Sequence, residues 1–184
     1  MILFRKSDAL GWLLASILKM KGLKRMSYVS MYELLPLIAM EETRTITVLP
    51  GNPFGVPAGN YGLLEMYCND EECDCRRVFI SVVSSVVKDT VAVITFGWES
   101  KAFYAKWFNR GGTVKLPGMD KFGQYAVRGM HGIHLSNTSK QSKIAPAVLL
   151  MVTECALRDN AYVERLKRHY KLFRVKVDEQ HQSQ

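Results

Sequence analysis

The sequence predicts an α+β fold, in which an antiparallel β-meander carries a metal-binding hairpin tip and is covered by C-terminal amphipathic helices. Four runs rich in β-branched and aromatic residues lie between positions 43 and 96, and turn-forming residues separate them. Beyond position 140, apolar residues recur at helical spacing in two stretches. The chain has 184 residues, of which 48% are hydrophobic, so it can form one domain with a substantial core.

The predicted strands cover 43–49, 61–67, 78–87 and 91–96. The first strand is followed by a segment rich in proline, glycine and asparagine, which are residues that form turns. Lys88 and Asp89 reverse the chain between the last two strands. Because the strands follow one another closely along the chain, we expect neighbours to pair in antiparallel fashion.

Three helices are expected after or beside these strands. The first covers 99–108, and the second covers 141–157 with Pro146 in its first turn. Asp159 or Asn160 is placed to cap the third helix. The apolar side of the third helix comprises Tyr162, Leu166, His169, Tyr170 and Phe173.

The two ends of the chain are assigned separately from the domain. Residues 1–25 are interpreted as an N-terminal extension with the apolar spacing of an amphipathic helix. Its apolar run, 9–18, is shorter than the roughly 20 residues that a membrane span needs, and no small-x-small cleavage site follows, so we expect no membrane association. We expect residues 26–177 to form a single α+β domain, which carries the zinc site predicted below, and 178–184 to form a polar, disordered tail.

Three of the four cysteines lie within eight residues, in the loop between the second and third predicted strands. Cys68, Cys73 and Cys75 follow the pattern Cys-x4-Cys-x-Cys, and thiolates at this density are ligands that Zn²⁺ prefers. The pattern therefore predicts a zinc site at the tip of a hairpin. A disulfide and unligated thiols are the alternatives. Cys155 lies on an apolar helix side, where core packing is its expected role.

Electrostatics restrict the fourth ligand of this site. Three thiolates on a divalent ion leave one surplus negative charge, and the loop also holds acidic residues at positions 70, 71, 72 and 74. A neutral histidine therefore fits better than another carboxylate, and His131 and His134 are the candidates. Arg76 and Arg77 follow the last cysteine and are expected to neutralise the excess charge as neighbours of the ligands.

The formal net charge of +8 is unevenly distributed. Residues 1–25 and 163–177 each carry a net +5, whereas residues 26–98 carry a net −5. Arg165, Arg168 and Lys171 lie on the basic face of the last helix and are the candidates for nucleic-acid contact. Because the acidic part of the chain can neutralise the same charges internally, nucleic-acid binding is not favoured, and we expect an unidentified protein partner.

Several stretches resemble a bacterial protein family that is marked by a YC-x4-CDCRR loop and has no assigned activity. They are ETRTITV (42–48), PAGNYGLLEMYCNDEECDCRRVFISV (57–83), KQS (140–142) and AYVERLKRHYKLF (161–173). The resemblance covers roughly residues 30–175. It implies a bacterial, cytoplasmic protein and no particular activity.

Two functions are compatible with the sequence. The favoured one is a small protein in which zinc is structural and the surface serves interaction with a protein or a nucleic acid, because closed sites rich in cysteine are usually structural. The alternative is a metal-dependent hydrolase with an open zinc position, in which Glu65 or Glu42 acts as general base. No HExxH, GxSxG, P-loop or dinucleotide-binding motif supports an enzyme.

Overall fold

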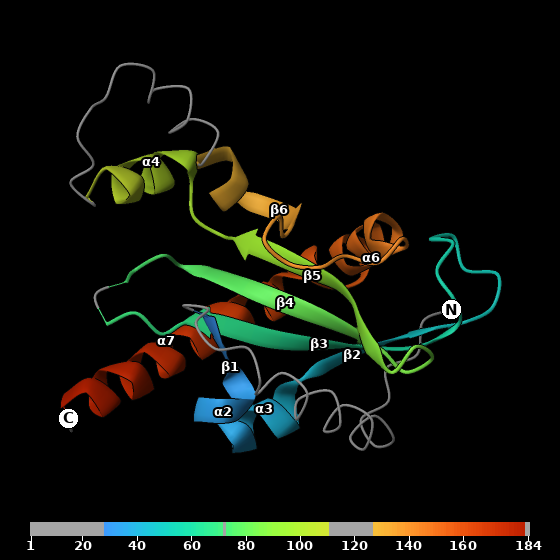
Figure 1. Ribbon diagram of the computed structural model, residues 1–184, viewed down its shortest axis with the longest axis horizontal. Coiled ribbons are helices and arrows are strands. Elements are labelled where there is room, and N and C mark those ends of the chain that lie inside the picture. The colour runs from blue at the N-terminus through green and yellow to red at the C-terminus, as the bar shows by residue number, and fades with distance from the viewer. Residues whose placement is uncertain (1–27, 72, 111–126, 183–184) are drawn as a thin grey trace.

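A computed structural model describes residues 28–71, 73–110 and 127–182, and these ranges fold as an antiparallel sheet with helices packed on it (Figure 1). The α+β class predicted from the sequence is confirmed. The N-terminal extension predicted at 1–25 lies outside the described residues.

The sheet has six strands, and β3 is the strand around which the others are arranged. The strands are β1 (Tyr28–Ser30), β2 (Arg44–Val48), β3 (Gly59–Cys68), β4 (Arg77–Ser84), β5 (Asp89–Gly97) and β6 (Gly132–Leu135). The order is β1-β3-β4-β5-β6, and β2 pairs with the first half of β3 while β1 pairs with its second half. The four predicted strands are therefore present as an antiparallel meander, and β1 and β6 extend the sheet beyond it.

The helices are α2 (Met31–Leu34), α3 (Pro36–Glu42), α4 (Lys101–Arg110), α6 (Ala145–Val152), the π-helical turn η1 (Thr153–Leu157) and α7 (Asn160–Gln182). The predicted cap of α7 is Asp159, whose Oδ1 accepts a hydrogen bond of 3.0 Å from the backbone N of Ala161.

Two helix boundaries differ from the prediction. The helix expected from position 141 begins at Ala145, because the side chain of Gln141 instead bonds the backbone N and O of Val93 on β5, each at 3.0 Å. The polar tail expected from position 178 is helical as far as Gln182. Ion pairs one helical turn apart, such as Arg174 with Asp178, support this last stretch.

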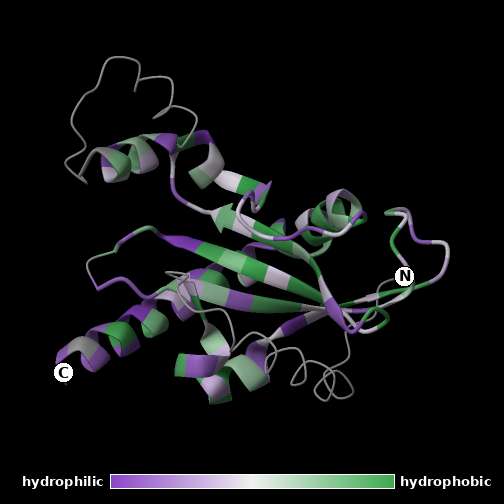
Figure 2. Cartoon of the chain, viewed as in Figure 1, coloured by the Kyte–Doolittle hydropathy of each residue, from purple (hydrophilic) through white to green (hydrophobic). Residues whose placement is uncertain are grey.

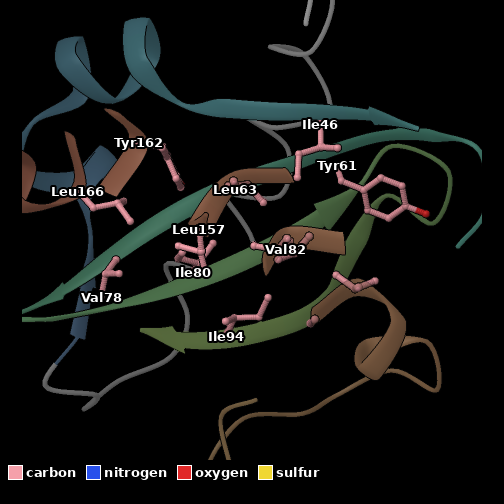
Figure 3. Packing of buried hydrophobic residues seen from close by; sticks show 14 of the residues in the cluster. Ile46, Tyr61, Leu63, Val78, Ile80, Val82, Ile94, Leu157, Tyr162 and Leu166 are labelled. Carbon is pink, nitrogen blue, oxygen red and sulfur yellow. The ribbon is translucent and has the colours of Figure 1, made fainter. Parts of the chain in front are cut away.

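The main core lies between one face of the sheet and the helices α6, η1 and α7 (Figure 3). Ile46, Leu63, Ile80 and Ile94 contribute from successive strands, and each is fully buried. Figure 2 shows hydrophobic residues along these strands and hydrophilic residues distributed along α7. The loop that connects β3 to β4 lies at the same end of the sheet as the C-terminal half of α7 (Figure 1).

Candidate metal centre

The β3–β4 hairpin brings the three clustered cysteines together. Cys68 is the last residue of β3, Cys75 lies two residues before β4 begins, and Cys73 lies in the loop between them. Their Sγ atoms all lie within 4.8 Å of one another. A tetrahedral zinc ion with Zn–S bonds of about 2.3 Å holds its sulfurs about 3.8 Å apart, so small side-chain movements would suffice for all three to bind one ion. The donor set therefore fits a metal such as Zn²⁺.

The three sulfurs differ in their access to solvent. Cys68 and Cys75 are only 3% and 2% exposed, whereas Cys73 is partly exposed. Tyr28 on β1 places its hydroxyl 3.6 Å from the Sγ of Cys75, and the Sγ of Cys68 lies 3.5 Å from a carboxylate oxygen of Asp70. All four cysteines are free thiols rather than disulfides, which leaves the clustered sulfurs available as ligands.

The clustered thiols shift one another's acidity. Hydrogen bonds from the thiols of Cys68 and Cys73 lower the pKa of Cys75 to about 3. The same contacts and burial raise the pKa of Cys68 far above its ordinary value. The pKa of Cys73 is raised to about 11, because Cys75 and burial outweigh the opposite effect of its hydrogen bond with Cys68. The three sulfurs therefore titrate as one interacting group, and a metal ion would replace the contacts between them.

Helix α7 holds the cysteine loop through its backbone. The guanidinium of Arg174 donates hydrogen bonds to the backbone oxygens of Cys68 at 3.3 Å, Asp70 at 2.7 Å and Glu71 at 2.6 Å. One helical turn earlier, the hydroxyl of Tyr170 donates to a carboxylate oxygen of Asp74 at 3.3 Å. Arg174 is one of several basic residues along α7, but its side chain is only 13% exposed. No spacing pattern in the sequence pairs this arginine with the loop.

Of the two arginines that follow Cys75, Arg76 contacts acidic side chains and Arg77 contacts a backbone oxygen. Arg76 donates to both carboxylate oxygens of Asp74, at 2.9 and 3.0 Å, and to Glu99 at 3.1 Å. Arg77 donates to the backbone oxygen of Gly129 at 3.2 Å. The hydroxyl of Tyr104 on α4 donates to the backbone oxygen of Arg76 at 2.9 Å. Arg76 therefore balances the acidic loop, which α4 holds on one side and α7 on the other.

Neither predicted histidine belongs to the cysteine group in the described part of the chain. His131 lies with Nδ1 2.8 Å from the backbone oxygen of Glu99, the same residue whose carboxylate binds Arg76. His134 lies on β6 opposite Thr95, and its Nε2 is 2.8 Å from the backbone oxygen of His131. His131 is thus connected to the cysteine loop through Glu99 and Arg76, while His134 is exposed.

A cleft of about 790 Å³ lies between the cysteine loop and α7. Cys73 is the member of the cysteine cluster that lines it, and Trp98 lines it from the segment after β5. Its other lining residues are charged or aromatic: Glu71, Asp74, Arg76, Glu99, Glu164, Lys167, Arg168, Tyr170, Lys171, Arg174 and Asp178. Cations and carboxylates are equally numerous there, so the cleft is polar without a strong net charge.

The predicted nucleic-acid residues are mostly occupied within the molecule. The guanidinium of Arg165 lies 4.9 Å from the ring centre of Tyr162, and Arg168 forms an ion pair with Glu42 on α3. Lys171 is exposed and has no ion pair among the described residues. Internal neutralisation of the basic helix by the acidic part of the chain therefore occurs at Arg168.

A buried polar network connects three elements on the core side of the sheet. His169 on α7 is 1% exposed, and its Nδ1 lies 2.7 Å from Glu65 on β3 while its Nε2 lies 3.1 Å from Glu42 on α3. The hydroxyl of Tyr67 donates to the same oxygen of Glu65 at 2.6 Å. The sequence singled out both glutamates as general bases and treated His169 as a packing residue. Glu65 is the one acidic residue within the apolar strand β3, and this position indicates that its carboxyl group needs a buried hydrogen-bond partner.

No family model, curated protein or solved structure matches this chain. The resemblance to the YC-x4-CDCRR family therefore stays a prediction. None of the helices within the described ranges is long and apolar enough to cross a membrane. The fold and the site together define an α+β protein with a three-cysteine cluster at a hairpin tip that can hold a metal ion.

Proposed function

We propose that this chain is a zinc-binding protein in which Cys68, Cys73 and Cys75 hold a structural Zn²⁺. The observation that carries the proposal is the convergence of the three sulfur atoms within 4.8 Å. Thiolate ligands favour zinc over magnesium or calcium, which prefer oxygen ligands. A structural role is supported by the position of the cluster, because the ion would fix the loop that α4, α7 and β1 contact.

We propose His131 as the fourth ligand, in preference to His134. A metal-binding histidine usually donates its other ring nitrogen to a carbonyl or a carboxylate, which fixes the tautomer. The contact between Nδ1 of His131 and the backbone oxygen of Glu99 is of this kind and leaves Nε2 to bind a metal. A neutral imidazole would also add no further negative charge to a three-thiolate ion.

Cobalt substitution tests the donor set. Protein purified without chelator is expected to contain one zinc per chain, and the Co²⁺ form is expected to show thiolate-to-metal charge transfer and the intense visible bands of a tetrahedral site. Cys75→Ser removes a thiolate and should abolish the stoichiometric metal. Cys155→Ser is the matched control, because Cys155 lies outside the cluster in η1. Full zinc occupancy in Cys75→Ser would refute the metal site.

Paired histidine variants test the fourth ligand. His131→Ala should shift the visible bands of the Co²⁺ protein and weaken zinc binding by about 10- to 100-fold or more. His134→Ala should leave both unchanged, because His134 is exposed and contacts only a backbone oxygen. Identical spectra for the two variants and the wild type would remove His131 from the proposed site and leave the three cysteines in place.

The hydrolase alternative receives less support from the positions of its proposed bases. Glu42 and Glu65 both bind the ring of His169, and Glu65 is itself buried. A general base must approach the water that it activates, and both carboxylates are already engaged on the core side of the sheet. We therefore favour a binding protein whose surface serves a protein partner.

A further inference from the structure

We propose that Cys73 is the oxidation-sensitive sulfur of the metal centre, and that a hydroperoxide entering the cleft converts the cluster to a disulfide and releases the metal. This inference rests on the proposed zinc site and adds a form of regulation to it. Of the three clustered cysteines, Cys73 is assigned as the site of oxidation because of its position in the fold.

Access distinguishes Cys73 from its neighbours. Cys68 and Cys75 are buried at the end of β3 and just before β4, whereas Cys73 is partly exposed and lines the cleft. A cleft of about 790 Å³ is far larger than a peroxide molecule, so a small oxidant can reach this sulfur without unfolding the loop. Oxidation of cysteine is selective for accessible sulfur with thiolate character, and a metal-bound cysteine is a thiolate.

A second sulfur stands close enough to complete the reaction. The Sγ atoms of Cys68 and Cys75 both lie within 4.8 Å of that of Cys73, and a thiol next to a sulfenic acid is the usual resolving group. A disulfide needs an S–S bond of about 2.05 Å, so the two sulfurs must approach each other by rotation of their side chains and a local shift of the loop backbone. Cys155 in η1 does not belong to this cluster.

The chemistry balances with the peroxide and two protons from the solvent. The sulfur of Cys73 attacks one peroxide oxygen and the O–O bond breaks, so that sulfur loses two electrons and the departing hydroxide takes a proton to become water. The thiolate of Cys68 or Cys75 then attacks this sulfur, the S–S bond forms, the S–O bond breaks, and a second water leaves. Two thiolates, one hydrogen peroxide and two protons from the solvent give one disulfide and two waters. The metal loses two of its three thiolates and dissociates.

Formation of the disulfide would also affect helix α7, because α7 is hydrogen-bonded to the cysteine loop. Arg174 binds the backbone oxygens of Cys68, Asp70 and Glu71, and Tyr170 binds Asp74. A disulfide contracts the loop at Cys73 and alters the geometry of these contacts. Oxidation should therefore expose amides of residues 69–76 to hydrogen exchange and change protection in the C-terminal half of α7.

The test uses the full-length, zinc-loaded protein and hydrogen peroxide as the probe. We expect zinc release, measured with a chromophoric chelator, to parallel the loss of two free thiols. Peptide mapping with a sulfenic-acid reagent at early times should label Cys73 before the other cysteines. Dithiothreitol and zinc should restore the starting state. Cys155→Ser should release zinc at the wild-type rate, because Cys155 lies outside the cluster.

A variant that simply removes the Cys73 thiolate could fail to bind zinc, so a second variant replaces it with another zinc ligand. Cys73→His keeps a zinc-binding side chain and removes the oxidisable sulfur, and its zinc should resist peroxide at least tenfold longer than in the wild type. Early labelling of Cys155, or zinc retention by wild-type protein while Cys73 becomes oxidised, would overturn the inference. Absence of zinc before peroxide is added would instead refute the proposed function, so the two failures are distinct.

Discussion

The guanidinium of Arg174 donates a hydrogen bond of 2.7 Å to the backbone oxygen of Asp70, across more than one hundred residues of sequence. The same side chain also binds the backbone oxygens of Cys68 and Glu71. A single arginine on α7 therefore orders the cysteine loop through main-chain groups, and the loop sequence can vary around it without loss of these contacts.

Arg174→Gln is expected to destabilise the cysteine loop more than the rest of the fold. Hydrogen bonds to a charged donor contribute about 1.5–3 kcal/mol, so we expect a loss of about 2 kcal/mol in unfolding free energy and weaker zinc binding. Urea unfolding and competition with a zinc chelator measure the two effects. Lys176→Gln is the control, because Lys176 is on the same helix and its ion pair within the described ranges is with exposed Glu179. Equal stability and zinc affinity in both variants would contradict the role of Arg174.

The buried His169–Glu65 contact is expected to matter through the polar group that each partner leaves behind when the other is removed. His169→Leu removes a hydrogen-bond partner from a carboxyl group that is 4% exposed, and the loss of a partner by a buried polar group costs about 1–3 kcal/mol. The double variant His169→Leu with Glu65→Leu removes both polar groups and should recover most of that loss. The free energies of unfolding of the wild type, the two single variants and the double variant, measured with denaturant, form a double-mutant cycle. A single variant within about 1 kcal/mol of wild type would show that the contact is not needed.

The stability of the protein is expected to fall in acid through Glu42. Burial raises the pKa of this carboxyl, but hydrogen bonds from His169 and Arg168 outweigh it and lower the pKa below the ordinary value of 4.5. Because the folded-state pKa is depressed, the stabilisation is present above the unfolded value and is lost as the pH falls through the folded one. Glu42→Gln should therefore flatten the decline in unfolding free energy below about pH 4.5, measured by urea unfolding at fixed ionic strength. An unchanged acid profile would exclude Glu42 as a contributor.

Replacement of Arg165, Arg168 and Lys171 by Gln tests the nucleic-acid hypothesis. We expect no salt-sensitive binding of DNA or RNA near physiological ionic strength, for the wild type or the variant, because Arg168 already pairs with Glu42. The triple variant should lose stability, since Arg165 packs on the ring of Tyr162. Lys171→Gln alone is the control that alters charge without those contacts. A salt-sensitive complex that the triple change abolishes would reverse this interpretation.

The sequence predicted those parts of the protein that depend on local periodicity. Runs rich in β-branched and aromatic residues predicted the strands that became β2 to β5, and helical spacing predicted α6 and α7. The Cys-x4-Cys-x-Cys pattern predicted a sulfur cluster, because a hairpin brings residues on either side of its loop together whatever the rest of the fold does.

Only the tertiary structure shows which side chains from distant parts of the sequence contact one another. Glu42, Glu65 and His169 come from three separate elements, and nothing in their spacing predicts that one imidazole lies between two carboxylates. The sequence gives no partner for Arg174, because its contact with the loop depends on how α7 packs across the end of the β3–β4 hairpin. The sequence determines the chemistry of each side chain and the period of each element, but the pairing of polar groups depends on how the elements pack, which buries some charges and leaves others in water.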